Sequence, residues 1–128
     1  MPHRFPIRVY YEDTDLAGIV YHANYLRFIE RARSEMVEAM GIDQLAMKGD
    51  GVVLAVRHID ADYLRPAQFQ DDLVVETAVS SISGARMVMA QDVYRGADLL
   101  FAAKVTVIAM TLQGRSVRLP ADIRRAFG

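Results

Sequence analysis

The 128-residue sequence contains no cysteine. This absence excludes disulfide bonds, thiolate nucleophiles and cysteine-ligated zinc or iron–sulfur centres. Long apolar runs are also missing, because the longest uncharged one, residues 105–112, is far shorter than the roughly 20 residues that span a bilayer. The N-terminal segment lacks the apolar core of a secretory signal, so we expect a cytoplasmic protein with no membrane span.

An excess of one charge sign is absent as well. The chain has 15 basic and 16 acidic residues and a formal net charge of −1, so it has no overall field to attract nucleic acid or membranes. The one local bias is a C-terminal basic stretch, which is either a solvated tail or a small phosphate-contacting patch. Its residues are Arg115, Arg118, Arg124 and Arg125.

The motifs of several enzyme classes are missing. The sequence has no Gly-x-Ser-x-Gly elbow, no P-loop, no Gly-x-Gly-x-x-Gly and no His-Glu-x-x-His. The three histidines are too scattered to suggest a zinc site. The length suits a single domain, residues 1–128. Because 52% of the residues are hydrophobic, a high share for so small a chain, we expect part of this surface to be buried against a second copy.

Hydrophobic periodicity predicts one strand followed by one long helix. Residues 5–11 alternate between apolar and polar, as in a half-buried strand. Residues 23–40 carry an apolar arc at helical spacing, with Asn24 as a candidate N-cap and Gly41 as a candidate stop. Arg33 falls inside the apolar arc, where it either pairs across an interface or extends to solvent.

The remainder predicts four further strands after a short connection at residues 42–51. They cover residues 52–63, 73–81, 87–94 and 99–110, and turns at residues 83–84 and 95–98 make neighbouring strands antiparallel. The predicted class is therefore α+β, with one antiparallel sheet of about five strands that curls around the helix. Residues 99–110 are apolar on both faces, so the second face requires cover from another subunit.

Chemistry-bearing residues gather in the loop before the helix, which contains Glu12, Asp13, Asp15 and His22. A helix N-terminus presents unpaired N–H groups that polarise a carbonyl or hold an oxyanion. A neighbouring carboxylate can activate water or attack directly, and together these groups suit acyl-transfer hydrolysis. Two other interpretations stay open: ordinary turn and capping residues, or the four ligands of a metal-dependent hydrolase.

This loop and helix resemble the 4-hydroxybenzoyl-CoA thioesterase family of hotdog proteins, and most closely its Tol–Pal-associated acyl-CoA thioesterase branch. The pattern Asp-x-Asp-x-x-Gly-x-Val-x-x-x-x-Tyr followed by this helix is specific, whereas Asp-x-Asp alone would be weak. The similarity covers nearly the whole chain. The matching segments are residues 10–25, Glu30-Arg-Ala-Arg-Ser-Glu-Met36, Tyr63-Leu-Arg-Pro-Ala67 and Asp71-Asp72.

The resemblance implies a hotdog fold, in which a long central helix is wrapped by the sheet, and an acyl-CoA thioesterase that assembles as a homodimer or homotetramer. The family's catalytic carboxylate falls on Asp15, and its carbonyl-polarising N–H falls on His22. In the 4-hydroxybenzoyl enzymes an aromatic residue is common at the position of His22, so a histidine there favours the Tol–Pal branch.

The same resemblance implies no metal and no organic cofactor. The substrate would be a thioester of coenzyme A or acyl carrier protein, with Tyr21 and Arg86 as substrate-binding candidates. A non-catalytic protein that binds acyl thioesters or associates with an envelope complex is the alternative. Basic residues at the dimer edge are candidates to contact the coenzyme A phosphates: Arg57, Arg65, Arg86, Arg95 and Lys104.

Overall fold

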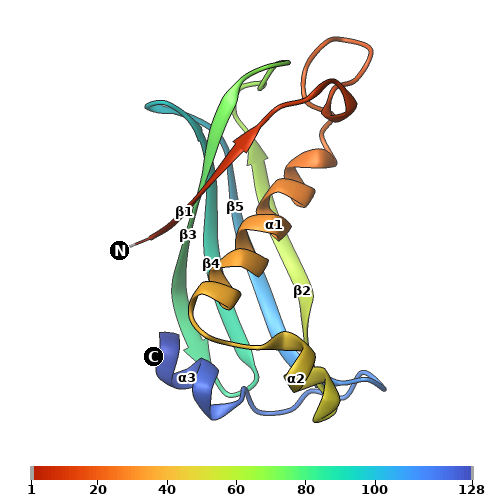
Figure 1. Ribbon diagram of the computed structural model, residues 1–128, viewed down its shortest axis with the longest axis vertical. Helices are drawn as coiled ribbons and strands as arrows, with labels where there is room; N and C mark the ends of the chain where they lie inside the picture. Colours follow the sequence, from red (N-terminus) through yellow and green to blue (C-terminus); the bar gives the residue numbers. More distant parts are fainter. Residues whose placement is uncertain (1, 128) are drawn as a thin grey trace.

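The computed structural model describes residues 2–127. A five-stranded antiparallel sheet curves around helix α1, as Figure 1 shows, and the strand order is β1-β3-β4-β5-β2. This arrangement confirms the predicted α+β class. The strands are β1 (His3–Arg8), β2 (Val52–Tyr63), β3 (Asp72–Ser83), β4 (Arg86–Arg95) and β5 (Asp98–Thr111); the helices are the 3-10 turn η1 (Tyr11–Asp13), α1 (Asn24–Ala39), α2 (Gln44–Gly49) and α3 (Ala121–Phe127).

Helix α1 forms because its apolar arc can be buried against the concave face of the sheet. Phe28, Ile29 and Ala32 are fully buried there, and burial of a side chain as large as Phe28 contributes about 1.5–3 kcal/mol. The predicted stop is confirmed: Gly41 has φ +83°. Its N–H donates to the Glu38 carbonyl at 2.9 Å, and the next N–H donates to Val37 at 3.3 Å, which together close the helix.

Three local predictions near the ends of elements were wrong. The alternating strand stops at Arg8, and Tyr11 lies exposed in η1. Asn24 is not the N-cap; it is the first helical residue, and Ala23 precedes it without a capping side chain. The connection at residues 42–51 contains α2, which Asp43 caps by accepting a hydrogen bond from the Ala46 N–H at 3.1 Å.

Arg33 follows neither of its two predicted interpretations. Its side chain is buried, with 7% of the residue exposed. One guanidinium nitrogen donates to the Gln91 side chain at 2.7 Å and the other to Glu30 at 2.6 Å. Gln91 in turn donates to the Ile29 carbonyl and the Thr77 hydroxyl, at 2.9 and 3.0 Å. A buried charge is tolerated here because this network ties α1 to the middle of the sheet.

Strand β2 forms one edge of the sheet and pairs with β5 along its whole length, with a bulge between Val56 and His58. The other face of β5, turned away from α1, carries Thr106, Ile108 and Met110, all half-buried within the single chain. No helix among residues 2–127 is long and apolar enough to cross a membrane.

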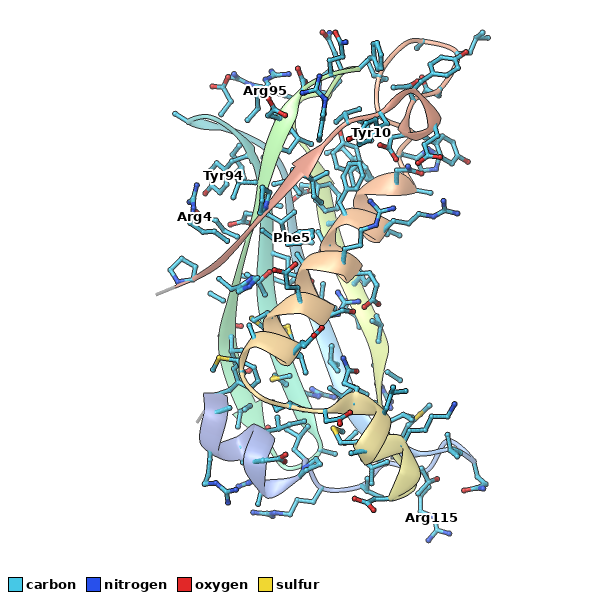
Figure 2. All side chains as sticks on the ribbon, in the orientation of Figure 1. Arg4, Phe5, Tyr10, Tyr94, Arg95 and Arg115 are labelled. Carbon is cyan, nitrogen blue, oxygen red and sulfur yellow. The ribbon has the colours of Figure 1, made fainter. Side chains whose placement is uncertain are left out.

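The basic C-terminal stretch packs on the core through its apolar residues, while Arg115, Arg118 and Arg125 are exposed to solvent. Leu119 and Ile123 are buried, and Ile123 anchors α3 on the core. Arg115 lies at the end of the molecule that holds α2 and α3, whereas Tyr10 and Arg95 lie at the opposite end, beside the loop before α1 (Figure 2). The basic stretch therefore lies far from the loop that contains Glu12, Asp13, Asp15 and His22.

Candidate active site

Asp13 serves as the internal support of the loop. The residue is buried, with 4% exposed. Its carboxylate accepts the Tyr10 N–H and the Asn24 side-chain amide, both at 2.9 Å, and its carbonyl accepts the Tyr21 N–H at 2.8 Å. The carboxylate thus joins the segment that follows β1 to the start of α1. This bonding leaves Asp13 no free oxygen for chemistry at the surface.

Asp15 has the opposite environment, because it is exposed to solvent. One carboxylate oxygen accepts the Ala17 N–H at 2.9 Å, which shapes the turn that Gly18 closes with φ +82°. The Asp15 N–H donates to the Ile19 carbonyl at 2.9 Å. Its second carboxylate oxygen has no hydrogen-bond partner within residues 2–127, so an ionised Asp15 can accept a proton or attack a carbonyl carbon.

The start of α1 supplies the complementary donors. The Asn24 N–H closes a turn by donating to the Tyr21 carbonyl at 2.8 Å, and Asp13 holds this turn by accepting the Asn24 side-chain amide and the Tyr21 N–H. Within the described part of the chain, the backbone N–H groups of His22 and Ala23 have no acceptor. Two such donors at a helix N-terminus, where the macrodipole is positive, can stabilise negative charge on an oxygen atom.

Asp15 and His22 line one cleft of about 410 Å³. The His22 ring lies 4.6 Å from the Tyr21 ring and 6.4 Å from the Tyr63 ring, measured between centroids. The structure therefore brings the predicted carboxylate and the predicted histidine to the same opening. The cleft is lined by Asp15, Ile19, Val20, His22, Tyr25, Tyr63, Leu64, Arg65 and Pro66.

An aromatic cluster forms the wall of this cleft. The Tyr25 ring stacks on Phe101 at 4.9 Å, and the Tyr63 ring packs edge-on against both. The Tyr25 hydroxyl accepts the Ala67 N–H at 3.0 Å. Burial raises the pKa of the Tyr25 hydroxyl, so this group stays neutral across the ordinary pH range. The Tyr63 hydroxyl donates to the His22 carbonyl at 2.8 Å.

The predicted substrate-binding residues are placed differently from one another. Tyr21 is exposed beside His22. Arg86 is the register partner of Ile108 on β5, which lies seven positions along that strand from Phe101. Phe101 is the register partner of Tyr63, which lines the cleft. At about 3.3 Å per residue, Arg86 lies roughly 23 Å from the cleft of its own chain.

The other basic candidates also differ in their surroundings. Arg65 lines the cleft and pairs with Asp98 at 3.5 Å. Arg95 is held by Asp71 at 2.8 Å. Arg57 lies in the bulge of β2, and Lys104 is exposed on β5. Among residues 2–127 there is no cluster able to hold a metal ion, so the structure does not bring together as such a cluster the residues Glu12, Asp13, Asp15 and His22.

Sequence reasoning did not single out Tyr63 and Tyr25 as site residues. Tyr25 appeared as one residue of the helix's apolar arc, and Tyr63 as the end of a strand. The signal that bears on Tyr63 is its position directly before the Leu-Arg-Pro-Ala67 turn, which resembles the thioesterase family. Its contact with His22 joins residues 41 positions apart, and no local pattern encodes such a contact.

A family comparison bears on this geometry, because the model of the thioesterase-like superfamily matches residues 9–127. The chain belongs to this superfamily. Among its relatives, the acyl-CoA thioester hydrolase YbgC of Escherichia coli is 38% identical over 126 residues, covering 97% of this chain and 94% of that protein. The acyl-CoA thioesterase YbgC of Haemophilus influenzae is 38% identical over 125 residues, covering 96% and 92%.

Solved structures agree with the fold. A probable thioesterase from Bartonella henselae superposes with a TM-score of 0.89 at 38% identity, covering 94% of this chain and all of that one. A 1,4-dihydroxy-2-naphthoyl-CoA thioesterase from Synechocystis superposes with a TM-score of 0.91 at 23% identity, covering 99% and 96%. The predicted hotdog fold is confirmed by these likenesses.

Proposed function

We propose that this protein hydrolyses the thioester bond of an acyl-CoA, releasing a free acid and coenzyme A. The observation that carries the proposal is one cleft, lined by the exposed Asp15 and by His22, beside a helix start that has two unpaired N–H groups. The names of the YbgC relatives support the same substrate class. His22 and the loop pattern further support the Tol–Pal-associated branch of the family.

In the proposed mechanism, the thioester carbonyl oxygen lies against the N–H groups of His22 and Ala23. These donors stabilise the oxyanion that forms when the carbonyl carbon becomes tetrahedral. Asp15 either removes a proton from the attacking water or attacks the carbon itself to form a mixed anhydride, which water then hydrolyses. In both routes the C–S bond breaks and the thiolate leaves with the electron pair.

His22 has a second function in this proposal. Its ring is exposed at the mouth of the cleft, where it can orient the attacking water or give a proton to the departing sulfur. The backbone N–H of the same residue acts independently of the ring. Replacing the side chain therefore removes only one of the two contributions of His22.

The proposal includes a homodimer, or a tetramer built from it, in the cytoplasm, where coenzyme A thioesters are available. Antiparallel pairing of two β2 edges would lengthen the sheet and place the far end of one subunit beside the cleft of the other. Such pairing moves Arg86 of the partner subunit toward the cleft that its own chain keeps remote. Arg86, Arg65 and Tyr21 are then the residues that we propose to contact the substrate.

The test is a hydrolysis screen with a thiol-reactive dye over short, long, branched and aromatic acyl-CoAs. We expect turnover of at least one class, and we expect Asp15→Asn to lower kcat by about 10²–10⁴, the range for one general acid–base group. His22→Ala should retain more activity than Asp15→Asn, since its backbone N–H survives. Acyl-CoA that binds without turnover in the wild type would instead support the non-catalytic alternative.

A further inference from the structure

The Tyr63 hydroxyl makes a contact that the mechanism above does not use. It donates a 2.8 Å hydrogen bond to the His22 carbonyl, across 41 positions of sequence. Within residues 2–127, this carbonyl has no other donor, because the Leu26 N–H turns instead to the Ala23 carbonyl at 3.2 Å. The His22 carbonyl, two residues before α1, is thus held by a side chain of the sheet and not by the helix.

The peptide unit involved also carries one of the two unpaired N–H groups at the start of α1. The His22 carbonyl and the Ala23 N–H belong to the same planar group, so a hydrogen bond that fixes one fixes the direction of the other. A donor on the carbonyl also polarises the peptide, which makes the N–H at its other end a stronger donor. The Tyr63 hydroxyl therefore acts on the Ala23 N–H through the carbonyl of the same peptide.

The position of Tyr63 is itself well determined. Its ring packs against Phe101 at 5.0 Å and against Tyr25 at 5.5 Å, while the residue as a whole is 51% exposed at the cleft. Tyr25 is in turn held through the Ala67 N–H. A rigid aromatic wall thus presents one hydroxyl group to one peptide.

We propose that Tyr63 is a positioning residue for thioester hydrolysis, which orients and polarises the His22–Ala23 peptide so that its N–H stabilises the oxyanion. The inference rests on the proposed function. Its effect should appear in the chemical step, because the hydroxyl does not need to touch the substrate in order to act on this peptide.

The first experiment compares four proteins: wild type, Tyr63→Phe, Asp15→Asn and the matched control Tyr94→Phe. Tyr94 is a half-buried tyrosine on the sheet face turned away from α1 (Figure 2). With the acyl-CoA that the wild type hydrolyses fastest, Tyr63→Phe should lower kcat about tenfold, the effect of one lost hydrogen bond, and leave KM within about twofold. Tyr94→Phe should match the wild type, and thermal melts should show all four folded.

The second experiment reads the carbonyl directly. An acyl-CoA labelled with ¹³C at the thioester carbonyl is bound to Asp15→Asn, which should retain binding without turnover, and its infrared stretching band is compared with that of the free thioester. We expect bound substrate to show a lowered frequency, and Tyr63→Phe in the same background to return part of this shift. A purely structural contribution of Tyr63 would not move this band.

The outcomes separate the two proposals. A wild-type kcat for Tyr63→Phe, a loss confined to KM, or an unchanged carbonyl band would overturn the positioning role while Asp15→Asn remains inactive. An inactive wild type would overturn the proposed function instead, and a fully active Asp15→Asn would overturn the catalytic role of Asp15.

Discussion

At the residue scale, Asp13 and Asp15 show how burial divides two identical side chains. Asp13 is enclosed and accepts hydrogen bonds on both carboxylate oxygens, whereas Asp15 is exposed and keeps one oxygen free. The hydrogen bonds to the Tyr10 N–H and the Asn24 amide occupy both carboxylate oxygens of Asp13 in holding the loop. We therefore propose that Asp15 carries out the chemistry and that Asp13 supports the loop.

This division predicts a different defect for Asp13→Asn. An asparagine has one oxygen and one NH₂ group, so one of the two donors that face residue 13 loses its acceptor, which costs about 1–3 kcal/mol. We expect the thermal midpoint to fall by several degrees. The folded variant should keep kcat within about threefold of the wild type. If Asp13→Asn instead loses turnover without any change in melting, the choice of catalytic acid is wrong.

At the scale of elements, the outer face of the sheet places like charges side by side. Asp92 on β4 is the register partner of Glu76 on β3, which is itself ion-paired with Arg4 of β1. Partial burial, and then the Glu76 carboxylate, raise the pKa of Asp92. The folded protein therefore holds the Asp92 proton more tightly than the unfolded chain does.

The raised pKa of Asp92 determines the direction in which the stability of the protein changes with pH. Because the folded pKa of Asp92 lies above the unfolded value of 3.8, stability decreases as pH rises through this window, and ionised Asp92 is destabilising at neutral pH. Asp92→Asn should raise the free energy of unfolding at pH 7 by less than about 1 kcal/mol, and the thermal midpoint should rise with it. This gain in stability should shrink toward pH 4. The matched control, Asp60→Asn, removes a carboxylate opposite Lys104 and should give no gain.

The elements that periodicity encodes strongly could be predicted from the sequence. The predicted bounds of β2 match those observed, and α1 and the other long strands agree within a few residues, because each has an apolar face long enough to reveal its period. The 3-10 turn at Tyr11 and the short helices α2 and α3 were missed. Each is only one or two turns long, and each depends on one capping or packing interaction.

The functional residues also divide into those that could be predicted from local sequence and those that could not. Asp15 and His22 could be found because they lie close together in sequence, on one loop beside one helix. Tyr63 reaches the His22 carbonyl only through the pairing of β2 with β5, and Arg33 finds Gln91 only when α1 packs on β4. Contacts of this kind depend on the topology, so they cannot be predicted from the hydrophobic pattern that predicts the elements.

At the scale of the whole molecule, the single chain leaves apolar surface and backbone groups without cover. Strand β2 offers an unpaired edge of 12 residues, and Val56 on it is 42% exposed. Half-buried Ile108 and Met110 add apolar surface on the outer face of β5. An edge of this length favours pairing with another strand, and closed two-fold pairing of identical edges is the common solution.

We therefore predict a dimer joined through β2. Light scattering at micromolar concentration should report about twice the chain mass of 14.3 kDa, or a multiple of that dimer. Val56→Lys places a charge at the edge and should shift the protein toward monomer. The matched control, Leu112→Lys, changes an exposed leucine outside β2 and should remain a dimer. Since we propose that Arg86 of the partner subunit reaches the cleft, the Val56→Lys monomer should also bind acyl-CoA more weakly. A wild-type monomer at micromolar concentration would contradict both the β2 interface and the shared cleft.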